Sequence, residues 1–200
     1  DGRLIRLDRE HGQTMPVGQW TGLTVTLLPV AEEQVYRLSF ETPPEARPRL
    51  RGEADIDLAT GQTRFEGLVG LEELDDALPS RYVRWRRRYQ LSGEMSWTGQ
   101  ASMATATEPA AAGLRRLTVT LQDVSMTFPP DEGGLSLRNV EGEIVFTDDA
   151  VEIRRLTGRV VGGQGATIDV TGRYLGYEAD SPFRIVVDVH GLQVPLPEDL

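Results

Sequence analysis

The sequence contains no cysteine and no lysine, and each absence excludes a class of site or partner. Without cysteine, the chain can form neither a disulfide nor a thiolate metal site. Every basic side chain is therefore an arginine, and the 21 arginines face 31 acidic residues, which leaves a formal net charge of −10. A nucleic acid is excluded as the main partner, because a phosphate backbone requires a basic surface.

Long hydrophobic runs are also missing. No stretch of about 18 apolar residues exists, so no helical membrane span is expected, and the sequence has no signal-peptide pattern. The chain begins at Asp1 on what already resembles a strand. We therefore expect a fragment of a longer protein, whose targeting or anchoring segment lies outside these residues. The apolar content of 39% and charged content of 26% are typical of a folded protein.

What the sequence does contain is alternation of apolar and polar residues, most regularly from Leu114 to Tyr174. Period-two alternation predicts an antiparallel sheet with one apolar face and one wetted face. The apolar face has to be covered by something, and the identity of that cover decides the function. The residues predicted to line this face are Leu117, Val119, Leu121, Val124, Met126, Phe128, Ile144, Phe146, Val151, Ile153, Val160, Ile168 and Val170.

Two parts are expected along the chain, an N-terminal β segment over residues 1–113 and a C-terminal β meander over residues 114–200, joined in one continuous sheet. A helical insert at about residues 70–88 interrupts the first part, where leucines recur at helical spacing and acidic residues precede arginines. The segment 108–113 is expected to be a linker. The strands expected outside the meander are Gly2–Leu7, Gly22–Pro29, Val35–Glu41, Leu50–Leu58, Thr63–Val69, one from Tyr89 to about Thr107, and Phe183–Val189.

A short phrase recurs four times, with an apolar residue two positions before a glycine and a charged residue after it. Glycine inside a strand marks a bend, a bulge or a close approach of another group. The spacing is irregular, which favours a repetitive sheet with hairpins of variable length over a strict solenoid. The four glycines are Gly52, Gly93, Gly142 and Gly172.

The stretch from Leu137 to Phe146 (LRNVEGEIVF), followed by Val151–Gly158 and Gly162–Gly172, resembles the C-terminal repeat of bacterial AsmA-like proteins. The resemblance extends over about residues 50–174. It implies a mainly β fold, a long twisted antiparallel sheet shaped like a taco, with an apolar groove and one short helical insert. It also implies a periplasmic protein tethered to the inner membrane, which shelters phospholipid acyl chains on their way between the inner and outer membranes. The implied partners are those acyl chains, flanking segments of the same longer chain, and other envelope proteins.

An arginine-rich cluster near the end of the helical insert offers a candidate contact for anionic lipid head groups. It comprises Arg84, Trp85, Arg87 and Arg88, with aromatic residues placed as at a membrane interface. The alternative is a solvated helix end, in which these arginines pair with the acidic residues at 72–76.

No pattern typical of an enzyme or a cofactor site is present. His11 and His190 lack partners at ligand spacing, and the Asp55-x-Asp57 pair departs from a calcium loop because Gly61 comes one place late. The segment 162–165 lacks the ending of a phosphate-binding loop and predicts a turn. We expect a protein that is not an enzyme and has no cofactor. Two alternatives stay open, a structural or interaction β module without lipid binding and, less favoured, a carbohydrate-binding or hydrolytic β-sandwich.

Overall fold

The computed structural model describes residues 2–7, 14–20, 22–30, 34–46, 49–72, 87–103, 113–176 and 180–191. The fold is mainly β, and one 3-10 helix, η3 (Pro130–Glu132), lies between two strands. The strands are β1 (Gly2–Leu7), β2 (Thr14–Trp20), β3 (Thr24–Pro29), β4 (Val35–Glu41), β5 (Leu50–Asp57), β6 (Gln62–Gly70), β7 (Ser92–Ser102), β8 (Gly113–Thr127), β9 (Ser136–Thr147), β10 (Ala150–Val160), β11 (Thr167–Leu175) and β12 (Phe183–His190).

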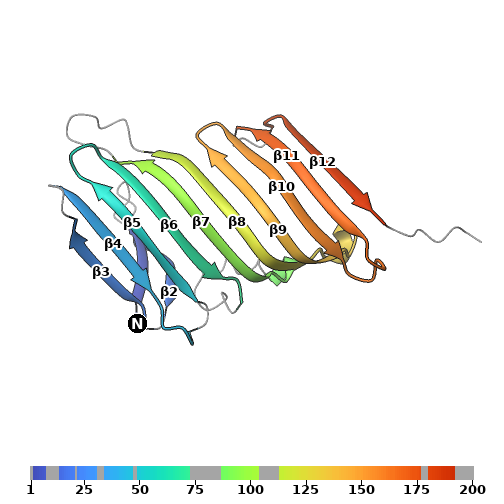
Figure 1. Ribbon diagram of the computed structural model, residues 1–200, viewed down its shortest axis with the longest axis horizontal. Helices are drawn as coiled ribbons and strands as arrows, with labels where there is room; N and C mark the ends of the chain where they lie inside the picture. Colours follow the sequence, from blue (N-terminus) through green and yellow to red (C-terminus); the bar gives the residue numbers. More distant parts are fainter. Residues whose placement is uncertain are drawn as a thin grey trace, which may run out of the picture.

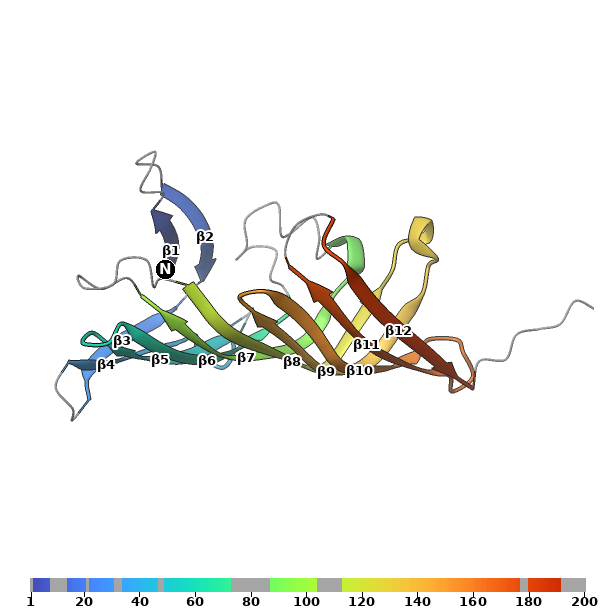
Figure 2. The same ribbon diagram turned by 90° about the horizontal axis from the view of Figure 1, so that it is seen from above.

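Strands β3 to β12 form one open, antiparallel, ten-stranded sheet in which every strand pairs with its neighbours in the sequence (Figure 1). The sheet continues from β7 to β8 without a break, so it crosses the boundary predicted at residues 113 and 114. Strands β1 and β2 form a separate two-stranded sheet, which stands on one side of the large one (Figure 2). The long twisted antiparallel sheet expected from the sequence is therefore confirmed.

The cross-strand register divides the large sheet into two faces of different chemistry. The face we name the apolar face contains a row that runs from β3 to β12 and is aliphatic or aromatic at nearly every position. The neighbouring row points to the opposite side, the polar face, and is mostly hydroxyl or charged. The apolar row is Leu27, Leu38, Ala54, Phe65, Gly99, Leu117, Phe146, Val151, Tyr174 and Phe183, and the polar row is Thr26, Ser39, Glu53, Glu66, Thr98, Thr118, Val145, Glu152, Arg173 and Arg184.

The hydrophobic core lies on the apolar face, where residues from loops fold over the strands. Leu71 and Leu91, which flank the connection between β6 and β7, are both buried in it. Tyr89 packs edge-on against Phe128, with ring centroids 5.8 Å apart. The most deeply buried large side chain is Val124, which is 1% exposed. The core is thus made by one sheet and its own connections.

In the part of the sheet from β3 to β7, three aromatic side chains, on β4, β6 and β7, lie over glycines on an adjacent strand. Trp97 is paired with Gly67, and a β-carbon at Gly67 would collide with the indole. Phe40 lies over Gly52 and Phe65 over Gly99 in the same way. The pairings among β3, β4, β5, β6 and β7 have no register shift. The rings therefore fill the space that side chains would otherwise occupy on the apolar face.

Strands β8 to β10 are instead interrupted by β-bulges. The β8–β9 pairing shifts twice, around Asp123 on one strand and Asn139 on the other. Both residues have φ 50, a left-handed conformation that Asp and Asn tolerate, and Asn139 Nδ2 donates a hydrogen bond to Asp123 Oδ1. The first shift, at Asp123, returns Val124 to the apolar face opposite Val140, and the second, at Asn139, restores the register beyond it.

The predicted strands agree with the structure to within a few residues, with three corrections. Strand β2 is not among the predicted strands, and Gly113, expected to end a linker, is the first residue of β8. The strand expected from Tyr89 begins only at Ser92, because residues 87–89 are helical. The helical insert expected at about 70–88 falls mostly outside the described residues, and its first position, Gly70, belongs to β6.

Candidate functional site

The predicted lining residues lie together on the apolar face. Leu117, Phe146 and Val151 are directly opposite one another on β8, β9 and β10, and Val119, Ile144 and Ile153 form the next row. Of the whole predicted set, Val124 and Ile168 are buried, and the others are partly exposed. The sequence thus places these side chains on one face, and whether that face holds a ligand stays a prediction.

Exposure on this face rises sharply at both ends of the sheet. On β12, Phe183 is 66% exposed and Val187 52%, and on β3, Val25 is 58% exposed. These residues are not in the predicted lining set, although the alternation in the segment 183–189 is visible in the sequence. The only other sheet among the described residues, the β1–β2 pair, stands on the same side of the large sheet as η3 (Figure 2). The face is a broad, partly open hydrocarbon surface.

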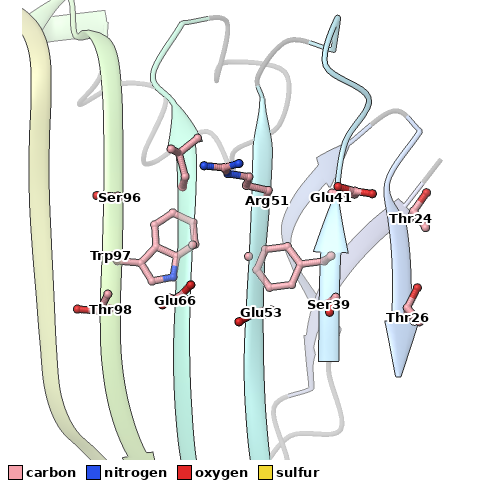
Figure 3. A pocket seen from close by; sticks show the side chains of 14 residues that line it. Thr24, Thr26, Ser39, Glu41, Arg51, Glu53, Glu66, Ser96, Trp97 and Thr98 are labelled. Carbon is pink, nitrogen blue, oxygen red and sulfur yellow. The ribbon is translucent and has the colours of Figure 1, made fainter. Parts of the chain in front are cut away.

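A shallow hollow of about 620 Å³ lies over β3 to β7 (Figure 3). Hydroxyl and charged side chains surround it, and the indole of Trp97, which belongs to an apolar row, extends from β7 across β6 (Figure 3). Glu53 and Glu66 are directly opposite each other here, an arrangement of like charges that costs stability. Among the residues that the structure describes, no group of three or more histidine or acidic side chains is placed to hold a metal.

The acidic pair Asp55 and Asp57 serves two structural roles. Arg37 donates two hydrogen bonds to Asp55, Nε to Oδ1 at 2.7 Å and Nη2 to Oδ2 at 2.8 Å, which lowers the pKa of Asp55. Asp57 accepts hydrogen bonds from the Thr60 hydroxyl and from the amides of Thr60 and Ala59, which lower its pKa. Asp57 therefore closes the β5–β6 turn, and the interpretation of this segment as a turn after a wetted strand agrees with these contacts.

The arginine cluster proposed for head-group binding is only partly described. Arg84 and Trp85 lie outside the described residues, and Arg87 is exposed. Arg88 makes ion pairs at 2.7 Å with Asp131 and Glu132, on η3 in the β8–β9 connection, and these contacts raise its pKa. The partners are 43 and 44 residues away. The alternative drawn from the sequence paired these arginines with the acidic residues at 72–76 and did not include Asp131 or Glu132. The local sequence carries no signal for so distant a contact.

The remaining candidate residues that the structure describes lie at the end of a strand or in a turn. His190 ends β12 with its Nε2 3.7 Å from Asp169 Oδ2, and His11 lies outside the described residues. The segment 162–165 forms the turn between β10 and β11, as predicted. Among the described residues, no helix has both the length and the apolar character needed to cross a membrane.

Comparison of the chain with protein-family models, with curated proteins and with solved structures returned no match. The resemblance to AsmA-like proteins therefore stays a prediction that depends on the residues quoted for it.

Proposed function

We propose that this chain is a non-enzymatic β-groove segment of an envelope protein, whose apolar face shelters phospholipid acyl chains between the inner and outer membranes. The observation that supports this is the continuity of the apolar face over all ten strands, with exposure increasing at both ends. A soluble protein rarely exposes a large contiguous apolar patch unless it binds something there.

Hydrocarbon chains suit this surface energetically. Burial of one methylene is favourable by about 0.8 kcal/mol, so two chains of about 16 carbons gain on the order of 20 kcal/mol before entropy and desolvation losses. Neighbouring rows on β8, β9 and β10, such as Val119–Ile144–Ile153, are chemically alike. Because adjacent positions have similar energies, an acyl chain can move along the face without a large barrier.

Site-specific photo-crosslinking tests the proposal. A benzoylphenylalanine at Phe146, on the apolar face, is compared with one at Thr118, on the polar face of the adjacent strand. After incubation with vesicles of phosphatidylethanolamine and phosphatidylglycerol, irradiation is expected to produce a lipid adduct at position 146 and none at position 118. Absence of an adduct at 146, or equal adducts at both positions, contradicts lipid binding on this face.

A second candidate function is a structural or interaction β module without lipid. The open edges of the sheet at β3 and β12 favour it, since an unpaired edge can accept another strand. The same crosslinking experiment separates the two, because a module without lipid binding would give no lipid adduct at position 146 with vesicles.

A further inference from the structure

Among the described residues, strand β12 is an edge of the sheet, and no other strand pairs with its outer side. It pairs with β11 through all eight of its residues without a register shift, and every residue is exposed. It contains neither proline nor glycine, the residues that commonly interrupt an edge. The opposite edge, β3, ends at Pro29, which has no amide hydrogen to donate. A straight edge such as β12 offers its free backbone groups to another strand.

The charges on β12 are matched poorly by those of the neighbouring strand β11. Arg184 is opposite Arg173, and Asp188 is opposite Asp169. Like charges directly opposite each other across two strands are unfavourable. Asp169 is compensated by Arg155, whose Nε lies 3.1 Å from its Oδ1, whereas Arg184 and Asp188 make no ion pair within the part of the chain that the structure describes. Both edge charges therefore face outward without an opposite charge.

The sequence of β12 is complementary to itself in one antiparallel register. If Val186 of one copy is opposite Val186 of another, Arg184 is opposite Asp188, and this pair occurs twice about the twofold axis. On the apolar face, Ile185 is then opposite Val187, and the outermost apolar residues, Phe183 and Val189, also meet. Moving the axis by one residue in either direction loses both opposite-charge pairs. One register thus satisfies the charges and the apolar rows together.

We propose that β12 is a self-recognition edge, at which two copies of this chain pair in antiparallel orientation about Val186. The twofold axis is perpendicular to the sheet, so the apolar faces of both copies lie on the same side and form one continuous surface. This pairing relieves the like-charge contacts of Arg184 and Asp188 and satisfies the open backbone groups of the edge. The dimer does not depend on the lipid proposal and is measured without lipid.

Charge-swap variants of the full 200-residue chain test the pairing by analytical ultracentrifugation over a range of concentrations. The unmodified chain is expected to form a dimer. Arg184→Asp and Asp188→Arg each place two like-charge pairs at the edge, and each is expected to raise the dimer dissociation constant at least about tenfold. An equal mixture of the two variants is expected to recover the dimer, because the carboxylate introduced at position 184 of one chain meets the guanidinium introduced at position 188 of the other. Recovery on mixing excludes misfolding as the cause of the loss.

A cysteine scan tests the register. The natural sequence has no cysteine, so Val186→Cys introduces the only thiol, and its symmetry mate is directly opposite at a Cα separation of about 4.5 or 5.5 Å, a span that a disulfide can bridge. Oxidation is expected to give a covalent dimer. The matched control is Thr171→Cys, on the same face one strand inward, which is expected to stay monomeric after oxidation.

Four outcomes overturn the proposal. They are an unmodified chain that stays monomeric at every concentration, a mixture of the charge variants that fails to dimerise, a species larger than a dimer, and equal crosslinking of Val186→Cys and Thr171→Cys. A larger species would indicate head-to-tail pairing of β12 with β3 instead, since heterologous contacts do not close.

Discussion

The two halves of the sheet build the same apolar face by different means. Strands β3 to β7 keep a regular register and cover cross-strand glycines with aromatic rings, as Trp97 covers Gly67. Strands β8 to β10 carry mostly aliphatic side chains and adjust the backbone instead, through facing bulges at Asp123 and Asn139. Side-chain packing stabilises one half and backbone conformation the other, so the two halves are expected to respond to different substitutions.

Gly142→Ala is expected to have the largest effect, because it attacks the backbone in the bulged half. Gly142 has φ 144, and a β-carbon there would collide with the backbone of Arg155 on β10. Since backbone atoms on both sides are fixed by sheet pairing, we expect a loss of about 3 kcal/mol in the free energy of unfolding, measured with urea. Gly113→Ala is the control, because nothing lies near its β-carbon position. A loss of unfolding free energy at Gly142 no greater than at Gly113 would mean that the bulged strand shifts to accommodate a β-carbon at little cost.

Trp97→Ala tests the other half. Removal of the indole uncovers Gly67 and is expected to cost about 2 kcal/mol in urea unfolding, less than the roughly 3 to 5 kcal/mol of a fully buried tryptophan. The control is Thr98→Ala, the next residue, which points to the polar face, with an expected change within about 0.5 kcal/mol. Adding Gly67→Ala to Trp97→Ala gives a double-mutant cycle. If the two losses in unfolding free energy are additive, Trp97 and Gly67 do not interact energetically.

Val124→Thr is expected to have an intermediate effect. Val124 is 1% exposed, and threonine keeps its shape while placing a hydroxyl in the core, at a cost of about 1 to 2 kcal/mol. Val119 lies on the same strand and the same apolar face but is partly exposed, so Val119→Thr is expected to lower the stability by less. Thermal unfolding of the two variants measures the difference. Equal losses at the two positions would show that water reaches the bulge.

The smallest expected effect concerns acid stability in the regular half. Hydrogen bonds from Arg37 lower the pKa of Asp55, so the folded state favours the charged carboxylate. The stabilisation is present above the ordinary pKa of an aspartate, about 3.9, and is lost as the pH falls through the lowered value. The free energy of unfolding of the Asp55→Asn variant should therefore differ from that of the unmodified chain more at pH 7 than in strong acid. A difference that does not change with pH contradicts this contribution.

Much of this architecture is readable from alternation alone. The strands from β3 to β12 and the shared face of the lining residues follow from period-two patterns, and the recurring phrase correctly marks its glycines as special positions. Gly93 and Gly142 lie at register shifts with positive φ, and Gly52 lies beneath Phe40.

What alternation does not reveal depends on contacts between distant residues. Strand β2 contains Pro16 and Gly18, which weaken a strand pattern, and it becomes visible only through its pairing with β1. The bulge at Asp123 depends on the strand opposite, and the partners of Arg88 lie on η3. Nothing in the local sequence indicates that β12 presents like charges to β11, because that follows from the register.

The strictly sequential order of strands has a consequence for how the chain acquires its structure. Each strand of the large sheet needs only the strand before it as a template, so most of the loops to be closed are short and their entropic cost is small, the connection over residues 71–91 being the longest. Assembly can proceed by stepwise addition from one end, in the manner of a linear array, as the polypeptide emerges. A chain cut after any hairpin would then keep a native-like, shorter sheet instead of losing its order altogether.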